Sequence, residues 1–404
     1  MTGPEDQASG PVRTADLDGF RFPLGTETLG LTWQPRERRP GALNLKSCEL
    51  QHPWSDQLVG NELAALTLAD TLAYPFQDRA LDALRVYHGL ETTRILLTAG
   101  SDNGIGLVVD ALVRPVGRLL LQEPAFEAWR HYASLRRVRV TGVPGVVGSP
   151  PVADPEPLLD AMRSAPGPCV AAVTNPGSPS GLLFAASAMR RFAETAGALG
   201  HLLVIDEAYG DFVQVSHAAL VAEFPHVVVV HSYSKAFALA GLRVAALLLH
   251  PDLREHVGRF RAENAVGAPG VALLERLAPQ GERWRDIWRD VRAVREEFVD
   301  RVLATHPEWR VLQPGANFAT FWSPDPATAD AARDHLAAHR VRIRSLSDMP
   351  GLRGCFRVSL ADRPRMARVA RLLDAVTDRP ADRRAGVAAA PATATSPTTG
   401  GGAP

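Results

Sequence analysis

A single lysine between small hydroxyl residues is the strongest chemical feature of this sequence. It is Lys235, in the run His231-Ser-Tyr-Ser-Lys-Ala236, and it follows the apolar β-branched run Val227–Val230, which predicts a buried strand. The chain has only two lysines, Lys46 and Lys235. Arginine stays protonated, whereas a desolvated lysine amine can bond covalently to a carbonyl compound. The pattern therefore favours covalent chemistry at Lys235, with a chance lysine in a surface loop as the alternative.

Length and composition narrow the classes of protein that this chain can belong to. Its 404 residues predict roughly two to three domains, and 46% apolar residues suffice for a large core. The formal net charge of +0 gives no sign of a nucleic-acid or polyanion binder. The sequence starts without a basic or apolar signal region, and no apolar run approaches the ~18 residues of a membrane helix.

The cysteines favour a reduced environment. Cys48, Cys169 and Cys355 are odd in number, scattered and in no Cys-x-x-Cys pattern. This argues against a disulfide framework and against a zinc site. We therefore expect a cytoplasmic protein with no metal site, no membrane segment and no nucleic-acid partner.

Strand-like and helix-like segments alternate between about residues 55 and 262. Such alternation predicts an α/β fold in which helices cover both faces of a mostly parallel sheet, here of seven strands. The expected strands cover residues 94–98, 118–122, 138–143, 169–174, 202–206, 227–230 and 244–249. The expected helices cover residues 61–72, 78–88, 155–164 and 186–199, with two more that begin near residues 103 and 126.

The pattern changes after about residue 263. A long amphipathic helix places Trp284, Trp288 and Val291 on one face, which is more typical of core packing than of a ligand site. Strand-like segments at 317–322, 341–344 and 355–360, with helices at 327–338 and 364–376, complete a smaller α+β domain over 263–378. The polar and Pro/Gly-rich ends, 1–20 and 379–404, are expected to be disordered.

Polar residues follow five of the expected strands. In open α/β sheets, ligands bind at the carboxyl ends of the strands. There the sequence has a helix start that suits a phosphate, an aromatic pair, an amide, a carboxylate and an amine. Each alone is weak, since a strand-end Asp or Asn is more often a turn former. Together they meet the needs of a pyridine-ring cofactor, and they are Gly100-Ser-Asp102, Phe126 with Trp129, Asn175, Asp206 and Lys235.

In this order, the motifs closely resemble those of fold-type I enzymes that depend on pyridoxal 5'-phosphate (PLP). The resemblance is to the class I/II aminotransferases, the group that includes histidinol-phosphate aminotransferases, and it covers roughly residues 40 to 378. It is carried by Tyr74-Pro75, Gly100-Ser-Asp102, Asn175-Pro-x-x-Pro-x-Gly181, Asp206-Glu-Ala-Tyr209, Ser232-x-Ser-Lys235, Gly241-Leu-Arg243 and Phe356-Arg-Val-Ser359.

The resemblance implies a domain plan and an activity. Residues 55–262 should form the large PLP-binding domain and 263–378 the small domain, while 21–54 should form an N-terminal arm that contacts the small domain or a dimer partner. The implied enzyme is an aminotransferase of amino-acid biosynthesis, which moves an amino group between an amino donor and a 2-oxo acid. It should be a homodimer with shared active sites.

The resemblance also implies which residues bind the cofactor. Lys235 should hold PLP covalently and shuttle the proton at the substrate Cα. Asp206 should pair with the pyridinium nitrogen and keep a low pKa beside that cation. Asn175 and Tyr209 should hydrogen-bond the ring 3-oxygen, and one aromatic should stack on the ring, where spacing favours Trp129 over Phe126. The phosphate should be bound by Gly100, Ser101, Asp102, Ser232, Ser234 and Arg243, and by Tyr74 of a partner subunit.

Two arginines are implied for the substrate. Arg357 should clamp the α-carboxylate through a bidentate pair, and Arg344 takes the place of a second anion-binding arginine. The entrance differs from many relatives, in which an Asn-Glu-Asn-Pro segment helps to close the site. Here Glu49 matches the glutamate, but Cys48 and Leu50 replace the asparagines. The donor therefore stays open between histidinol phosphate and an amino acid or amine of a specialised pathway.

Alternatives remain on the same fold and outside it. The same residues support decarboxylation, γ-elimination or amino-acid oxidation, and a non-catalytic binding protein is conceivable. In addition, Gly100-x-x-x-Gly104-x-Gly106 fits the pattern of short-chain NAD(P)-dependent oxidoreductases. That motif lies too deep in the chain to follow a first strand, however, and no tyrosine has a lysine four positions on.

Overall fold

A seven-stranded sheet forms the centre of the computed structural model, which describes residues 13–17, 20–24 and 40–376. The strand order is β4-β12-β11-β10-β9-β5-β6. All neighbours are parallel except β12, which runs antiparallel to both β11 and β4. The strands are β4 (Ile95–Thr98), β5 (Arg118–Glu123), β6 (Arg139–Pro144), β9 (Val170–Thr174), β10 (Leu202–Asp206), β11 (Val227–Ser232) and β12 (Ala245–Leu248). The predicted α/β fold with a mostly parallel seven-stranded sheet is confirmed.

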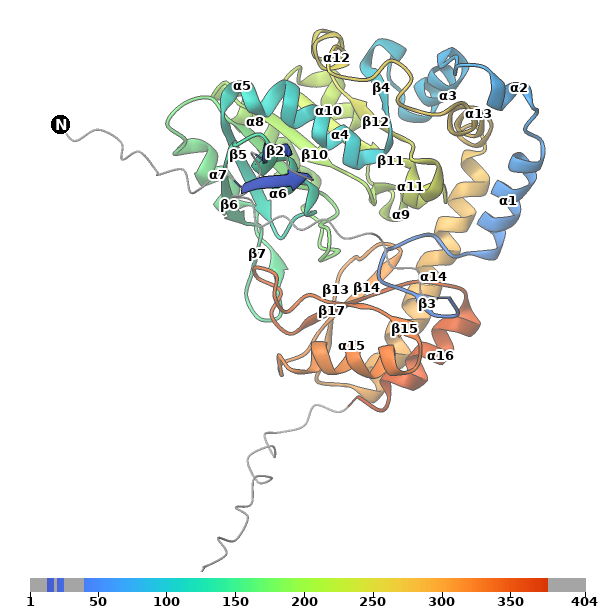
Figure 1. Cartoon of the computed structure of the whole chain (residues 1–404). Helices are drawn as coiled ribbons and strands as arrows, with labels where there is room; N and C mark the ends of the chain where they lie inside the picture. The colour runs from blue at the N-terminus through green and yellow to red at the C-terminus, as the bar shows by residue number, and fades with distance from the viewer. Residues whose placement is uncertain (1–12, 18–19, 25–39, 377–404) are drawn as a thin grey trace, which may run out of the picture.

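Helices cover both faces of this sheet (Figure 1). The central strands are almost wholly buried runs of Val, Leu and Ala. Because successive side chains of a strand point to opposite faces of the sheet, they pack into the hydrophobic cores on its two sides. Val204 joins the core under α4, whereas its neighbour Ile205 joins the core under α8. The helices of this large unit are α1 (Pro53–Ala64), α2 (Ala69–Leu72), α3 (Asp78–His88), η1 (Thr92–Arg94), α4 (Gly100–Val108), η2 (Val109–Val113), α5 (Arg114–Val116), α6 (Ala128–Leu135), α7 (Glu156–Arg163), α8 (Ala186–Ala198), α9 (Gly210–Val213), α10 (Ala218–Glu223), α11 (Tyr233–Ala236), η3 (Ala240–Leu242), α12 (Pro251–Gly258) and α13 (Ala268–Leu277).

A second, smaller sheet lies beyond the end of a long helix. The 25-residue α14 (Gly281–Thr305) runs from the large unit down to the small one (Figure 1). The small unit has the antiparallel order β13-β14-β17-β16, and β15 pairs in parallel with β3 from the N-terminal part of the chain. Its elements are β3 (Leu43–Asn44), β13 (Arg310–Leu312), β14 (Phe318–Trp322), β15 (Val341–Arg342), β16 (Arg344–Ser345), β17 (Cys355–Ser359), α15 (Thr328–Ala338) and α16 (Arg363–Leu373). Two further strand pairs are β1 (Arg13–Leu17) with β2 (Phe20–Leu24), and β7 (Val146–Val147) with β8 (Val152–Ala153).

Two expected helices begin elsewhere than the sequence pattern indicated. The helix expected at 61–72 is in fact α1, which starts at Pro53, and a separate α2. Its start is set by His52, whose side chain accepts a hydrogen bond from the Trp54 N–H. The helix expected from Asn103 starts at Gly100, because the Asn103 side chain bonds back to the Ala99 N–H. Both starts carry a hydrogen bond between a side chain and a nearby backbone N–H, and apolar periodicity does not detect such bonds.

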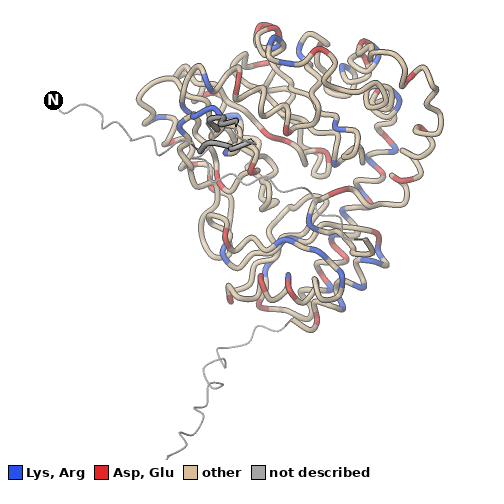
Figure 2. Tube along the Cα trace, viewed as in Figure 1, with Lys and Arg blue, Asp and Glu red and all other residues tan. Residues whose placement is uncertain are grey.

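The domain limits remain predictions. The helix α13 packs mainly on α3 and also on α1 and α2, although it follows the expected limit at residue 263. Most of the expected disordered ends, and part of the expected arm, lie outside the described residues. Figure 2 shows acidic and basic residues interspersed over both units. Within the described ranges, no helix is both long and apolar enough to cross a membrane.

Candidate active site

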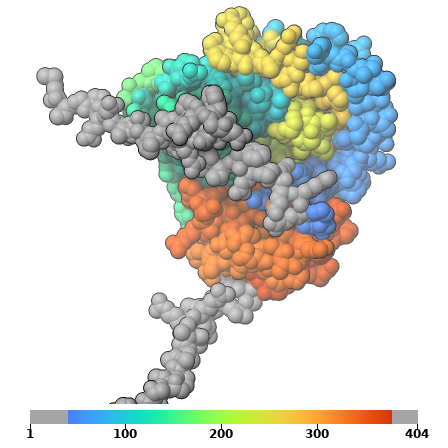
Figure 3. Space-filling view, in the orientation of Figure 1, coloured from blue at the N-terminus to red at the C-terminus, as the bar shows by residue number. Residues whose placement is uncertain are grey.

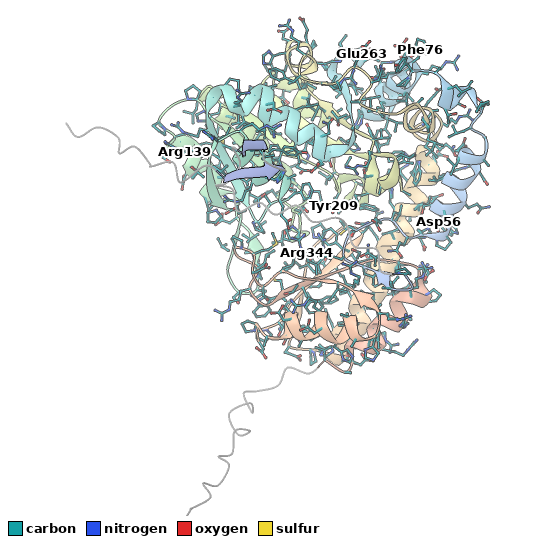
Figure 4. The ribbon with its side chains drawn as sticks, in the orientation of Figure 1. Asp56, Phe76, Arg139, Tyr209, Glu263 and Arg344 are labelled. Atoms are coloured by element: carbon teal, nitrogen blue, oxygen red, sulfur yellow. The ribbon has the colours of Figure 1, made fainter. Side chains whose placement is uncertain are left out.

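The strand ends that carry the predicted residues meet at the edge of the large sheet that faces the small unit. β9 ends at Thr174, next to the end of β10 at Asp206, and β10 lies beside β11, which leads into Lys235. In Figure 4, Tyr209 lies at the lower border of the large unit and Arg344 on the small unit below it. The parallel pairing therefore brings Asn175, Asp206 and Lys235 together, as the strand-end pattern predicted.

The amine of Lys235 and the guanidinium of Arg357 bind the same short segment. The Lys235 Nζ donates to the carbonyl of Ser47 at 2.8 Å, and the Arg357 Nη2 donates to the carbonyl of Lys46 at 2.8 Å. Arg357 is buried, and its Nε finds no hydrogen-bond partner among the described residues. Its guanidinium also lies over the Phe318 ring, 4.9 Å from the centroid. An amine and an arginine whose Nε has no partner among the described residues thus bind the same short segment, which suits a site for an amino acid.

Asp206 is buried at the end of β10. Its Oδ2 accepts from the indole N–H of Trp129 at 3.4 Å, and its Oδ1 from the Ala208 N–H at 3.2 Å. Burial raises the pKa of Asp206 to about 6, even though both hydrogen bonds lower it. The expected low pKa needs a cation, and none among the described side chains offsets the burial. A pyridinium nitrogen is such a cation, so the site fits the ring end of the predicted cofactor.

Of the two aromatic candidates, Trp129 is the one beside Asp206. Its side chain is buried, whereas Phe126 is 39% exposed. The indole N–H contact is made to the carboxylate that is expected to hold the ring nitrogen. This position supports the proposal that Trp129, and not Phe126, faces the ring.

The expected phosphate site lies between the start of α4 and the loop after β11. Gly100 has φ +83°, and the Arg243 guanidinium lies so close that any Cβ at this position would overlap it. The Ser234 hydroxyl is buried without a partner among the described residues, while the Ser232 hydroxyl accepts from the Ser234 N–H at 3.4 Å. A phosphate would satisfy Ser234 and pair with Arg243, so these residues fit the group.

The Asp102 side chain, beside Ser101 in the first turn of α4, already has a partner other than a phosphate. Its carboxylate accepts from the hydroxyl of Tyr132 at 2.9 Å. Any contribution of Asp102 to phosphate binding is therefore expected from its backbone N–H.

Asn175 and Tyr209 both have partners within the protein. The Asn175 amide pairs with the backbone of Phe184, at 2.9 Å from the N–H and 3.3 Å to the carbonyl, and its Nδ2 lies 3.3 Å from His217 Nε2. The Tyr209 hydroxyl lies near the Cys48 thiol, and burial raises the pKa of Tyr209 well above the ordinary value, with Cys48 adding to the rise. Bonds to a ring 3-oxygen remain a proposal for both residues.

Three predicted residues remain, which are Arg344, Glu49 and Tyr74. Arg344 forms an ion pair with Glu127, and the Glu49 carboxylate accepts from the Asn44 amide at 3.4 Å. Tyr74 is 78% exposed in the loop between α2 and α3. Figure 4 places Phe76, two residues on, at the periphery far from Tyr209. The structure therefore does not bring Tyr74 into the site of its own chain.

The structure also contains a buried glutamate, Glu207, that is paired with two histidines and that the sequence did not predict as part of the site. Glu207 accepts from the ring Nδ1 of His217 and of His231, at 2.9 Å each, and from the backbone N–H of His217 at 2.8 Å. Burial opposes its ionisation, but the two histidines outweigh burial and lower the pKa of Glu207 to about 2. Glu207 belongs to the Asp206-Glu-Ala-Tyr209 motif, and this motif was the one feature of the sequence that could have indicated it. Its histidine partners are separated along the chain and become visible only in the fold.

Comparisons with known proteins agree with this geometry. The sequence profile of the family described as "Aminotransferase class I and II" matches residues 54–376. The histidinol-phosphate aminotransferase of Deinococcus radiodurans is 30% identical over 325 residues, which cover 80% of this chain and 83% of that protein.

Solved structures with this fold include enzymes of two kinds. The histidinol-phosphate aminotransferase from Sinorhizobium meliloti, in complex with pyridoxal-5'-phosphate, has a TM-score of 0.71 at 23% identity and covers 83% of this chain and 90% of that chain. The L-threonine-O-3-phosphate decarboxylase from Porphyromonas gingivalis has a TM-score of 0.68 at 18% identity and covers 82% of this chain and 98% of that chain. These likenesses establish the fold.

Proposed function

The chain belongs to the class I and II aminotransferases, and we propose that its amino donor carries a second, anionic group such as a phosphate or carboxylate. Its cofactor is PLP, and its reaction moves an amino group between an amino donor and a 2-oxo acid. Histidinol phosphate, the substrate in the names of several relatives, has a phosphate but no carboxylate, so it would present a single anion to the two arginines.

The proposal rests mainly on one observation: Lys235 and Arg357 both donate hydrogen bonds to the segment of residues 46 and 47. The carbonyls of Lys46 and Ser47 belong to consecutive residues, so the amine and the guanidinium are both bound to one short segment of the chain. An amine beside an arginine with an unsatisfied Nε is the arrangement that an α-amino acid or 2-oxo acid requires.

Each residue of the site has a distinct proposed task. Bound PLP withdraws electrons from the substrate carbon that bears the amine, and so makes its C–H bond acidic. The Lys235 amine then takes and returns the proton at that carbon. Asp206 keeps a proton on the ring nitrogen, and Arg357 holds the carboxylate so that the carbon faces Lys235. Ser234 and Arg243 bind the phosphate.

The second anionic group is assigned to Arg344. Its side chain is 27% exposed, which leaves it accessible from the entrance. Lys46 lies in the same electrostatic environment: burial lowers the pKa of its amine first, and then Arg344 and Arg342 lower it further. Several cations gathered at an entrance attract a ligand with more than one negative charge.

The test is a half-reaction with a panel of donors. Purified protein saturated with PLP is mixed with donors that have or lack a distal anion, and the conversion of the cofactor to its amine form is followed by absorption. The proposal expects conversion, fastest with a distal phosphate or carboxylate. Loss of carbon dioxide without formation of the amine form would instead establish a decarboxylase.

Replacing Arg357 by alanine should raise the KM for a carboxylate substrate by about 10- to 100-fold, since a charged hydrogen-bonding pair contributes about 1.5–3 kcal/mol. Arg310→Ala is the matched control, because Arg310 lies on β13 of the same small sheet and donates to the nearby carbonyls of Pro307 and Trp309. Steady-state kinetics measure the effect. An unchanged KM in Arg357→Ala would mean that the carboxylate binds elsewhere.

We further propose that the protein is a homodimer formed through the face made by α1, α2 and α3. Large apolar side chains are exposed along this segment, which forms the light-blue edge of Figure 3. Contiguous exposed apolar surface marks an interaction site. These side chains are Trp54, Leu63, Leu68, Leu72, Tyr74, Phe76 and Val86. In such a dimer, Tyr74 would be available to the phosphate site of the partner subunit.

Placing a charge on this face should dissociate the dimer. Phe76 is 85% exposed, so Phe76→Asp leaves the fold of the chain intact but places a carboxylate at the apolar contact. Sedimentation velocity should show the wild type as a dimer and Phe76→Asp with at least tenfold weaker association. Leu199→Asp, at an exposed apolar position after α8, is the control and should remain dimeric. A monomeric wild type would refute the proposal.

We also propose a cytoplasmic location. All three cysteines are free and buried, which suits a reducing compartment.

A further inference from the structure

Two arginines lie directly opposite each other on neighbouring strands of the small sheet. Arg344 of β16 pairs in register with Arg357 of the antiparallel strand β17. Residues opposite in such a pair have their Cβ atoms about 4.5–5.5 Å apart on the same face of the sheet. Like charges in this position destabilise a sheet, so the pair needs negative charge nearby.

Within the described residues, that negative charge comes from the other unit. Glu127, at the start of α6 in the large unit, forms an ion pair with Arg344. Its side chain is 70% exposed, so the contact sits at the open side of the site. Glu127 is also two residues from Trp129, which lies beside Asp206. A carboxylate of the protein thus occupies the arginine to which we assign the distal anion of the substrate.

This ion pair is weak enough to be replaced. Glu127 is 70% exposed and Arg344 27%, and a pair that is open to water on one side adds little stability, because water screens it and the long side chains lose freedom. A ligand that Arg357 already holds through one carboxylate presents its second anion to Arg344 at high effective concentration. The ligand therefore competes from a favourable position, while the released Glu127 returns to water at small cost.

A transaminase must also accept two different substrates in one site. If one has a distal anion and the other a neutral side chain, Arg344 is needed in one half-reaction and left without a ligand in the other. Glu127 is placed to neutralise Arg344 in the second case. Lys46 adds to the positive charge around Arg344, so an uncompensated entrance would be strongly cationic.

We infer that Glu127 is a specificity-determining residue, an internal counter-anion of Arg344 that a substrate with a distal anion displaces and that a substrate with a neutral side chain leaves in place. This inference rests on the proposed function and adds to it the reason why one entrance serves both substrate classes.

The test compares two acids that differ only in the distal group. Glutarate has a carboxylate at each end of a five-carbon chain, and pentanoate has one. Calorimetry with PLP-saturated protein gives the Kd of each. Glu127→Gln should bind glutarate about fivefold more tightly, since it removes a competitor of about 1 kcal/mol. Its affinity for pentanoate should change by less than twofold. Unchanged or weaker glutarate binding in Glu127→Gln would overturn the inference.

Glu123→Gln is the matched control. Glu123 is the last residue of β5, four residues before Glu127, but it pairs with Arg130 within the large unit. It should change the affinity for neither acid, and an effect equal to that of Glu127→Gln would mean a general field effect and overturn the inference. In an Arg344→Ala background, the effect of Glu127→Gln should vanish, because the two residues act as a pair.

These outcomes separate the inference from the function on which it rests. If no donor forms the amine of the cofactor, the proposed function fails whatever the calorimetry shows. If donors react but glutarate affinity ignores Glu127, only the inference fails.

Discussion

Replacing Lys235 by alanine should abolish transamination and leave the fold intact. The lost amine performs both the covalent attachment of PLP and the proton transfer at the substrate carbon, so turnover should fall by at least about 10⁴-fold. The Lys235 Nζ donates to the Ser47 carbonyl, and one such bond contributes about 1 kcal/mol to stability. Far-UV circular dichroism and the melting temperature of the cofactor-free protein should therefore change little.

The control uses the only other lysine of the chain. Lys46→Ala retains Lys235, so reduction with borohydride should still fix one PLP per chain, and peptide mass spectrometry should locate it at Lys235. In Lys235→Ala the same treatment should fix none. Wild-type rates in Lys235→Ala would refute the covalent role.

Asp206→Asn should stabilise the cofactor-free protein and inactivate the loaded one. Burial raises the pKa of Asp206 from 3.8 to about 6, so the folded state holds its proton more tightly than the unfolded chain does. Stability therefore falls as the pH rises from about 4 to about 6, and above pH 6 the buried charge costs about 3 kcal/mol. Asparagine carries no charge and avoids this cost.

The loaded protein should respond in the opposite sense. A pyridinium nitrogen would compensate the Asp206 charge, so PLP should stabilise the wild type more than Asp206→Asn. Without the carboxylate the ring loses its proton, and turnover should fall by about 10²- to 10⁴-fold.

Urea unfolding of the cofactor-free proteins at pH 4.5 and pH 8 measures the first effect. The gain of Asp206→Asn over the wild type should grow with pH. Asp160→Asn, at a site whose side chain is 72% exposed, should show no such trend. Equal stabilities of Asp206→Asn and wild type at pH 8 would contradict the buried-charge explanation.

Strands and their ends were predictable because the signals are local. Runs such as Val227–Val230 are apolar over their whole length, and parallel pairing then obliges their carboxyl ends to meet at one edge. That geometry alone brings Asn175, Asp206 and Lys235 together from positions up to 60 residues apart along the chain. The role of each residue came from resemblance, which names functions that spacing cannot.

The contacts between Lys235 and the segment around Cys48 could not be predicted from local sequence. The segment around Cys48 reaches Lys235 because β3 pairs with β15 and the Cys48 N–H donates to the Ser359 hydroxyl at 3.0 Å. Both contacts join residues about 300 positions apart, so no local pattern indicates them. The pairing of Glu127 with Arg344 likewise depends on how the small unit sits against the large one.

The reversed direction of β12 has a consequence for how the cofactor is held. An antiparallel strand begins where its neighbours end, so Arg243 reaches the ligand edge by preceding its strand. Lys235 and Arg243 are therefore joined by one short connection, and the Tyr233 N–H bonds the Val244 carbonyl across its base at 3.3 Å. This one connection would then hold the cofactor at two points, its covalent attachment and its phosphate. If this connection moved relative to the rest of the sheet, both attachment points would move together. The bound cofactor would then move with them without being stretched.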